Sequence, residues 1–347
     1  MTPYQRLWWC SLGTAASLIQ RICNRILRII LPRNAWGDFV VAWASHVFYH
    51  RRFPRRYDPK RINDHFFKMK VSGELLNPLR QFVSDKEYVK HYITAIVGRR
   101  HILETFEILR SAAEVDQLLL DRFPCVIKPT HLSGHVLFYP DSDKPLDREL
   151  LKRWLKLNRY KIVREVNYRY LEPKIIVEEF FSEDGQTPAN DYKVHCFNGV
   201  PKLIQVDANR FVQPTRVLEG PTVPAVKVLY TPADADRFIQ QTKALYDTSW
   251  NRLPVGWLHR QKEEDDPKPA QLSLMLDVAT RLSEPFSLSD SGYIRVDMYT
   301  NGTEVRVGEL TNCPGGSNDN RFRPAAAEFA LGGLFEHDRA YDVASLT

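Results

Sequence analysis

The stretch GYIRVDMYTNGTEVRVGELTNCPGG, residues 292–316, has the pattern of two β-strands joined by a tight turn. The turn falls at Asn301-Gly302, two residue types that tolerate the positive φ angles of short hairpin turns. A second pair of this kind, Asn198-Gly199, lies within DYKVHCFNGVPKLIQVD. We therefore expect two β-hairpins in the C-terminal half of the chain.

The hairpin at residues 292–316 brings acidic side chains together. Arg295 and Asp297 share a face of its first strand, because alternate strand residues point the same way. Glu309 and Thr311 share a face of the returning strand for the same reason. Two neighbouring carboxylates repel each other unless a cation lies between them, and Mg²⁺, which prefers oxygen ligands, is the candidate. The alternative is that both carboxylates are solvated or paired with nearby arginines.

The stretch FPCVIKPTHLSGH, residues 123–135, contains a short apolar strand that ends at Lys128. A lysine there holds a positive point charge at the strand end, and the loop that follows contains Ser133 and Gly134, whose small size lets backbone amides approach phosphate oxygens. Glycine and lysine do not have the order or spacing of the GxxxxGK[ST] phosphate loop. We therefore expect a phosphate site of another kind.

Two further stretches place polar residues beside predicted strands. PKIIVEEFF, residues 173–181, indicates a buried strand that ends at Glu178-Glu179, a pair suited to hydrogen bonding a base edge. Asp191 precedes a strand that carries Lys193. In that arrangement the aspartate can bind ribose hydroxyls while the lysine points at phosphate. Together these stretches favour a nucleotide-binding site.

Positive charge is concentrated at the N-terminus. Residues 1–61 hold eleven lysines and arginines but two acidic residues, whereas the whole chain has a net charge of +6. Over residues 8–31, apolar side chains recur at helical spacing, and Arg21, Arg25 and Arg28 share the opposite face. This amphipathic basic helix is expected either to lie on an anionic membrane surface or to pack on the protein's own core with a solvated basic face.

Capping signals predict two helix starts. Ser84 with Glu87 three residues later has the pattern of a capping box ahead of an apolar helix. Ser111 with Glu114 forms a second box before a short helix. Periodicity and Pro232 at a first-turn position predict further helices over residues 147–158, 231–246 and 270–283.

The five cysteines are widely scattered and include no C-x-x-C pair, which argues against a disulfide framework and against a zinc site. Arginines interrupt the apolar N-terminal stretch, which argues against a bilayer span, and no small-residue cleavage site follows it as in a secretory signal. We expect a reduced, cytoplasmic protein, peripheral on the cytoplasmic face of the inner membrane if the N-terminal helix binds lipid.

As a set, these motifs resemble the ATP-grasp superfamily, and most closely the TupA-like ATP-grasp proteins of bacterial surface polysaccharide and teichuronopeptide gene clusters. The resemblance covers about residues 60–325 and is carried by SDKEYVKHYI, FPCVIKPTHLSG, IIVEEFF, DYKVHCFNG, IRVDMY and GELT. It implies an α+β fold, the ATP-grasp fold, in which two lobes grip ATP. The implied regions are a basic amphipathic helical region at 1–60, a helical region at 61–115, an N-terminal lobe at 116–182 and a C-terminal lobe at 183–347.

The resemblance also implies roles for the candidate residues. The implied nucleotide contacts are Lys128 and Lys193 for the phosphates, Ser133 and Gly134 in a lid loop, Glu178 and Glu179 for adenine, and Asp191 for ribose. The implied metal site is Asp297 and Glu309 with Thr311, Asn312 or water. Arg295 and Lys193 would stabilise negative charge during the reaction, and Arg210 would help to grip a carboxylate. A loop histidine such as His131 is more often a positioning residue than a catalyst.

The implied activity is that of an ATP- and Mg²⁺-dependent carboxylate-amine ligase. A uronic acid carboxylate of a surface glycan, or of its lipid-linked precursor, would be joined to an amino acid or another amine through an acyl phosphate. One alternative is an ATP-grasp kinase that phosphorylates a glycan hydroxyl, and another is a non-catalytic, membrane-associated nucleotide-binding protein. Nucleic acid is not an expected partner.

Overall fold

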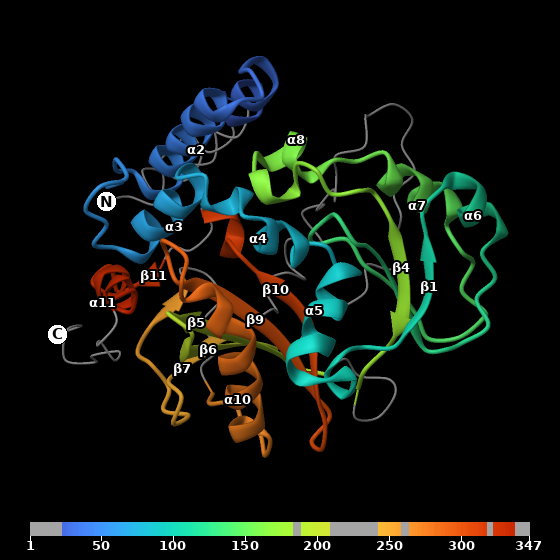
Figure 1. The fold of residues 1–347 in the computed structure, drawn as a ribbon. Coiled ribbons are helices and arrows are strands. Elements are labelled where there is room, and N and C mark those ends of the chain that lie inside the picture. Colours follow the sequence, from blue (N-terminus) through green and yellow to red (C-terminus); the bar gives the residue numbers. More distant parts are fainter. Residues whose placement is uncertain (1–22, 183–188, 209–241, 258–263, 318–321, 337–347) are drawn as a thin grey trace, which may run out of the picture.

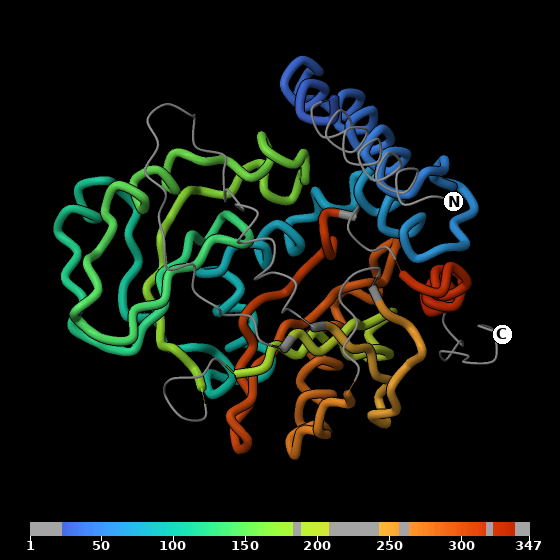
Figure 2. Tube along the Cα trace, turned by 180° about the vertical axis from the view of Figure 1, so that it is seen from behind, coloured from blue at the N-terminus to red at the C-terminus, as the bar shows by residue number. Residues whose placement is uncertain are grey.

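The computed structural model describes residues 23–182, 189–208, 242–257, 264–317 and 322–336. Its strands form two larger antiparallel sheets and a short two-stranded sheet that pairs β8 (Gly256–Trp257) with β11 (Phe322–Arg323). The two larger sheets lie on opposite sides of the molecule, with α4 and α5 between them (Figures 1 and 2). The architecture is α+β, as expected.

Helices cover the outer surfaces of both sheets and form the N-terminal edge of the molecule (Figure 1). The α-helices are α2 (Ala35–His50), α3 (Ile62–Val71), α4 (Pro78–Phe82), α5 (Tyr88–Val97), α6 (Ala112–Gln117), α7 (Arg148–Leu155), α8 (Arg159–Val163), α10 (Leu272–Ser283) and α11 (Ala327–Gly333). Short 3₁₀ turns are η1 (Glu74–Leu76), η2 (Arg99–His101), η3 (Val166–Tyr168), η4 (Glu284–Phe286) and η5 (Pro314–Ser317).

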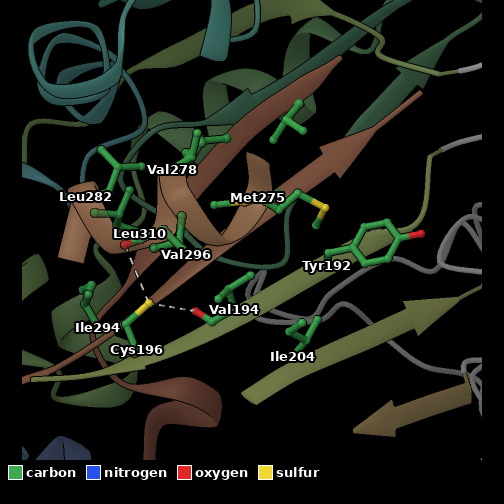
Figure 3. Close-up of a cluster of buried hydrophobic side chains, with 14 of the residues drawn as sticks. Tyr192, Val194, Cys196, Ile204, Met275, Val278, Leu282, Ile294, Val296 and Leu310 are labelled. Atoms are coloured by element: carbon green, nitrogen blue, oxygen red, sulfur yellow. Dashed lines mark hydrogen bonds between the residues drawn. The ribbon is translucent and has the colours of Figure 1, made fainter. Parts of the chain in front are cut away.

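The larger sheet has the strand order β10-β9-β5-β6-β7. Its strands are β5 (Asp191–Phe197), β6 (Val200–Ala208), β7 (Thr242–Tyr246), β9 (Tyr293–Thr300) and β10 (Val305–Thr311). One face is apolar and packs against α5 and α10, because every second strand residue points to it. Figure 3 shows this core, where Val194 and Val296 from neighbouring strands join Met275 and Val278 of α10.

The other face of the five-stranded sheet has an apolar half and a polar half. Phe197, Leu203 and Tyr293 form the apolar half, in one core cluster with residues of α3 and α11. Further along β5 and β9, the same face carries Lys193 and Asp297, which are paired across the two strands. The apolar half anchors the ends of the strands, and the polar half carries the candidate site.

The smaller sheet has the strand order β1-β4-β2-β3. Its strands are β1 (Thr105–Leu109), β2 (Cys125–Pro129), β3 (Leu137–Tyr139) and β4 (Ile175–Glu179). The strands over CVIKP and IIVEE are those predicted, and α6 and α7 contact the sheet through β1 and β4. Because β1 belongs to this sheet, the sheet begins before residue 116, where we had expected the N-terminal lobe to start.

Both predicted hairpins are confirmed. At the first, Asn198 and Gly199 have φ angles of 52° and 79°, as a two-residue turn of this type requires. At the second, Gly302 has a φ of 85° within a four-residue turn, Asn301 to Glu304. A bulge in β10 between Val307 and Glu309 then shifts the pairing of β9 with β10.

The predicted helix over residues 231–246 is wrong at its C-terminal end. Thr242–Tyr246 form the edge strand β7, and residues 231–241 lie outside the described part of the chain. Ala244 and Tyr246 are buried in the apolar core that packs on α10, with Leu245 on the opposite face. Pairing with β6 gives residues 242–246 the two-residue repeat of a strand. This repeat overrides the helical spacing of apolar residues that the sequence shows from Pro232 onwards.

The helix predicted after residue 84 is present, but its capping residue was misidentified. The Asp85 carboxylate accepts hydrogen bonds from the Glu87 N–H at 2.8 Å and the Tyr88 N–H at 3.2 Å, at the start of α5. Ser84 instead donates to the carbonyl of Arg80, four residues back. The second box is confirmed, because Ser111 accepts from the Glu114 N–H at 3.2 Å.

Of the predicted N-terminal helix, residues 23–30 are described and are helical, whereas residues 8–22 lie outside the described part. Arg28 was expected on a solvated or lipid-facing basic face, but its side chain donates to the Ile162 carbonyl at 3.1 Å. Asn24 is buried and accepts from Ser45 of α2 at 2.9 Å. A polar face thus packs on the protein. Within the described residues, no helix is long and apolar enough to cross a membrane.

Asp85→Ala is expected to destabilise the fold more than loss of a helix cap would. Besides capping α5, the fully buried Asp85 accepts from Thr130 at 3.0 Å and lies 3.2 Å from the Lys174 ammonium. We expect urea denaturation to give a loss of about 3 kcal/mol in the free energy of unfolding. The control Ser111→Ala removes a cap alone and should cost about 1 kcal/mol. Equal losses for the two variants would contradict this account of Asp85.

Candidate active site

The polar half of the five-stranded sheet is arranged by strand register. Lys193 of β5 lies opposite Asp297 of β9, and Asp297 lies opposite Glu309 of β10. Two residues further along the same two strands, Arg295 is paired with Thr311. Asp297 is 1% exposed and Lys193 is 4% exposed. The sequence prediction that these faces meet is therefore correct in its geometry.

Lys193 lies among three carboxylates. Its ammonium contacts Asp191 and lies 3.2 Å from Asp207 and 4.0 Å from Asp297. Burial favours protonation of Asp207, but Lys193 together with Lys243 outweighs it and lowers the pKa of Asp207. Asp191, expected at the ribose, here neutralises the lysine that was expected at the phosphates.

Arg295 binds Asp297 with two parallel hydrogen bonds of 2.6 Å, from Nε and from Nη2. Burial raises the pKa of Asp297, although Arg295 and Lys193 oppose this rise. Burial acts against the charge on Arg295, yet Asp297 outweighs it and raises the pKa of the guanidinium. Arg295 also donates to Thr311 at 3.1 Å. The charge of Asp297 is therefore balanced by protein cations, which was the alternative considered for this carboxylate.

The oxygen ligands at this face suit a magnesium ion shared with phosphates. Asp297, Glu309 and Thr311 offer two carboxylates and a hydroxyl, and Thr311 lies 3.4 Å from Glu309. Within the described residues, no group of three His, Cys, Asp or Glu side chains is placed to hold a metal by itself. Mg²⁺ commonly uses one or two carboxylates, with water and substrate phosphates completing its shell, so the residues present fit this ion.

Asn312 does not join this face. Its side chain is buried, accepts from Arg80 at 2.8 Å and donates to the Arg80 carbonyl at 3.1 Å. Asn312 directly follows Thr311, the last residue of β10, and its side chain is directed to Arg80 instead. Arg210, the predicted carboxylate-gripping residue, lies outside the described residues.

On the smaller sheet, Lys128 forms an ion pair with the buried Glu178, and the Lys128 side chain is 12% exposed. They lie diagonally across β2 and β4 on one face, since Lys128 pairs with Ile176 and Glu178 pairs with Val126. Lys90 of α5 also reaches Glu178, at 3.0 Å. Burial alone would raise the pKa of Glu178, but the two lysines outweigh it and lower that pKa. Lys128 and Lys90 thus share Glu178 as their counterion.

The predicted adenine pair, Glu178-Glu179, is split by strand alternation. Glu178 faces the lysines, whereas the Glu179 carboxylate accepts from the Glu104 N–H at 2.9 Å and lies 3.8 Å from Arg306. The two carboxylates therefore do not point at one ligand edge. The backbone of β4 is paired with both β1 and β2 over this stretch.

Sequence reasoning missed Lys86 and Lys90. Lys86 lies 3.9 Å from the Glu309 carboxylate and donates to the Leu132 carbonyl in the loop after β2 at 2.5 Å. Burial lowers the pKa of both lysines. Their i, i+4 spacing in SDKEYVK would have placed them on one helical face, but the stretch was interpreted as a capping signal. Together with Lys128 they form a cationic cluster near Glu309.

The loop after β2 is tied to the protein at its start and open at its tip. His131 is buried, accepts from the Lys174 N–H at 3.3 Å and contacts the Leu157 carbonyl at 3.2 Å. Gly134 is exposed with a φ of 77°, and no atom lies within 4 Å of the place where a Cβ would be. Gly134 is therefore open to solvent, and the role of Ser133 and Gly134 in covering phosphates stays a prediction.

Comparison with known proteins places this geometry in a family. The model of the TupA-like ATP-grasp family matches residues 69–218 and 225–336. The chain belongs to that family and has the ATP-grasp fold. No curated protein matches the chain.

Solved structures of several ligases are similar at low identity. D-alanine–D-alanine ligase from Bacillus anthracis is 18% identical, with a TM-score of 0.34 over 68% of this chain and 58% of that one. D-cycloserine synthetase is 17% identical, with a TM-score of 0.38 over 78% and 77%. Phosphoribosylamine–glycine ligase from Thermotoga maritima is 12% identical, with a TM-score of 0.34 over 69% and 51%. The chain thus spans less than two thirds of the length of the first of these ligases, and the family assignment depends on the family model.

The environment of His131 predicts acid sensitivity. Burial lowers its pKa from 6.5 to about 4, so the folded state resists protonation that the unfolded state accepts. Stability from this group is fully present above pH 6.5 and is lost as the pH falls towards 4, by up to about 3 kcal/mol. Urea denaturation across this range should show a smaller loss for His131→Gln than for the native protein. The control His91→Gln, at an exposed position, should keep the native pH dependence. An unchanged slope in His131→Gln would contradict the assignment.

Proposed function

We propose that this protein is an ATP- and Mg²⁺-dependent carboxylate-amine ligase that works through an acyl phosphate. The observation that carries the proposal is the proximity of a group of lysines, from the start of α5 and from β2, to two carboxylates of the five-stranded sheet. Lys86, near Lys128 and Lys90, lies 3.9 Å from Glu309, which is paired with Asp297. A triphosphate needs cations along its oxygens and a metal at the transferred group, and these two groups supply sites for both.

In this proposal the lysine cluster binds the ATP phosphates. In the structure, the Glu178 carboxylate neutralises Lys128 and Lys90. A phosphate oxygen is also negatively charged and would bind these ammonium groups in the same way. The open backbone at Ser133 and Gly134 covers the phosphates from the loop side. Asp191 remains the candidate for binding the ribose. The case for Glu179 as an adenine contact is weaker, because its side chain lies on the other face of β4 from the lysines.

Bound Mg²⁺ would neutralise charge between the phosphates and the carboxylates of Asp297 and Glu309. The γ-phosphoryl group moves from ATP to a substrate carboxylate oxygen, so that the bond from phosphorus to the ADP oxygen breaks as the new one forms. Lys193 and Arg295 lie on the same face and offset the negative charge that develops. An amine nitrogen then attacks the carbonyl carbon, phosphate leaves, the nitrogen loses a proton, and an amide results.

We propose that the acceptor carboxylate belongs to a uronic acid of a bacterial surface polysaccharide or its lipid-linked precursor, and that the amine is an amino acid or a related amine. Family membership supports this substrate class. Arg210 remains a candidate for gripping the carboxylate.

Glu309→Gln and Asp297→Asn are expected to reduce turnover by at least about 100-fold, because each removes a negative charge from the proposed metal site. Product formation with saturating ATP and Mg²⁺ measures this loss, and circular dichroism checks folding. Glu309 is the cleaner test, since its side chain is 33% exposed and Asp297 is needed to balance Arg295. The control Glu304→Gln removes a charge from the exposed turn of the same hairpin and should leave turnover unchanged. Full turnover by Glu309→Gln at ordinary Mg²⁺ concentrations would refute the metal assignment.

Mass spectrometry of the products tests the reaction class. Purified full-length protein is incubated with ATP, Mg²⁺, a panel of uronic-acid acceptors and a mixture of amino acids, and phosphate release is measured in parallel. We expect an acceptor mass increase equal to an amino acid less water, with release of one phosphate. A gain of one phosphoryl group without an amine would reassign the protein as a kinase. ATP binding without any product from the panel would contradict the proposed substrate class.

A further inference from the structure

Exposed apolar side chains are concentrated near the N-terminus. Of the fifteen large apolar residues that are exposed in the described chain, seven lie between residues 26 and 57. They are Ile26, Ile29, Ile30, Trp36, Trp43, Phe53 and Tyr57. We call these seven residues, together with the exposed arginines of the same segment, the basic aromatic surface. The other eight are spread over the remaining described chain, so this concentration calls for an explanation.

The aromatic part of this surface follows one side of α2. Trp36 and Trp43 are seven residues apart, which places them on the same helical face. Trp43 stacks on Phe53, with ring centroids 5.6 Å apart and an interplanar angle of 22°. The row therefore extends from the start of α2 to the segment after its end. Figure 1 shows α2 along an outer edge of the molecule, away from the two sheets.

Arginines are frequent in the same segment of the chain, and carboxylates are scarce in it. Exposed arginines include Arg25, Arg33 and Arg55. Between residues 23 and 61 the two acidic residues are already paired. Asp38 is buried and bound to Arg164 at 2.8 Å, and Asp58 lies 2.9 Å from Lys60. The surface thus combines exposed tryptophan and isoleucine with a net positive charge of its segment.

The surface is held rigidly to the rest of the protein. The guanidinium of Arg164, which is 1% exposed, donates to the carbonyls of Leu31 at 2.6 Å and Pro32 at 3.0 Å, and to Asp38 of α2. Tyr160 of α8 also donates to Asp38, at 2.9 Å. The helix that ends near residue 30 and α2 are therefore fixed to the segment that precedes β4. A ligand on this surface would orient the whole molecule.

We propose that the basic aromatic surface docks on the surface of an anionic lipid bilayer. Tryptophan prefers the boundary between headgroups and acyl chains, and each arginine near the membrane adds attraction to anionic lipid. A second copy of the chain fits less well, since a symmetric dimer would place this net positive surface against itself. The proposal is independent of the ligase activity.

Vesicle co-sedimentation of the full-length protein tests the apolar contacts. Vesicles of phosphatidylcholine with phosphatidylglycerol are compared with vesicles of phosphatidylcholine alone. We expect binding to the anionic vesicles and a loss of about tenfold or more in the double variant Trp36→Ser/Phe53→Ser. The control Leu119→Ser/Leu288→Ser changes two residues that are 82% and 94% exposed outside this surface, and should bind like the native protein. Circular dichroism and ATP binding verify that the variants are folded.

Salt and arginine substitutions test the charge. Binding should weaken as salt rises, and Arg33→Gln/Arg55→Gln should weaken it further, whereas Arg153→Gln on α7 should not. Failure of the folded native protein to bind anionic vesicles would overturn the proposal. Equal binding to neutral vesicles, or equal loss in the Leu119/Leu288 control, would also overturn it. A dimer that Trp36→Ser/Phe53→Ser disrupts, without vesicle binding, would assign the surface to a second copy instead.

Discussion

The bulge in β10 at Gly308 determines which residue lies opposite Asp297. Without it, the residue after Val307 would face Asp297, and Glu309 would point into the apolar core. The extra residue brings Glu309 into register with Asp297 and returns Leu310 to the apolar face. A Cβ at residue 308 would lie 2.5 Å from the Tyr299 ring, so a larger residue there would have to displace that side chain. The candidate metal site therefore depends on the register that this bulge sets.

Burying charges beside this bulge has a cost that pairing must offset. Asp297 and Lys193 are almost completely buried, and an isolated charge in such a place would be strongly destabilising. The bidentate Arg295–Asp297 pair and the three carboxylates around Lys193 keep each charge close to an opposite one. Replacing a charged residue on this face therefore affects its partners as well. The apolar core on the other side of the sheet holds the strands in register while these pairs form.

Local patterns predicted the parts of the structure that local forces determine. The Asn198-Gly199 turn and the strand faces at Arg295 and Asp297 follow from backbone preference and alternation, and both are as expected. Alternation also places the Glu178 and Glu179 side chains on opposite faces of β4. Because the two glutamates were expected to act together at adenine, this separation was not predicted. The contact between Lys86 and Glu309 could not be predicted in this way, since it joins residues far apart in sequence through tertiary packing.

The segment around Asp85 connects parts that would otherwise be independent. Asp85 caps α5, holds Thr130 at the start of the loop after β2 and balances Lys174 next to β4. The adjacent Lys86 extends from the same point to Glu309 of the five-stranded sheet. Because one short segment touches the loop, the smaller sheet and the larger sheet, a shift of that loop against the larger sheet must either move Lys86 or break its hydrogen bond to the loop. Loop position and the Lys86 ammonium beside Glu309 are therefore mechanically coupled.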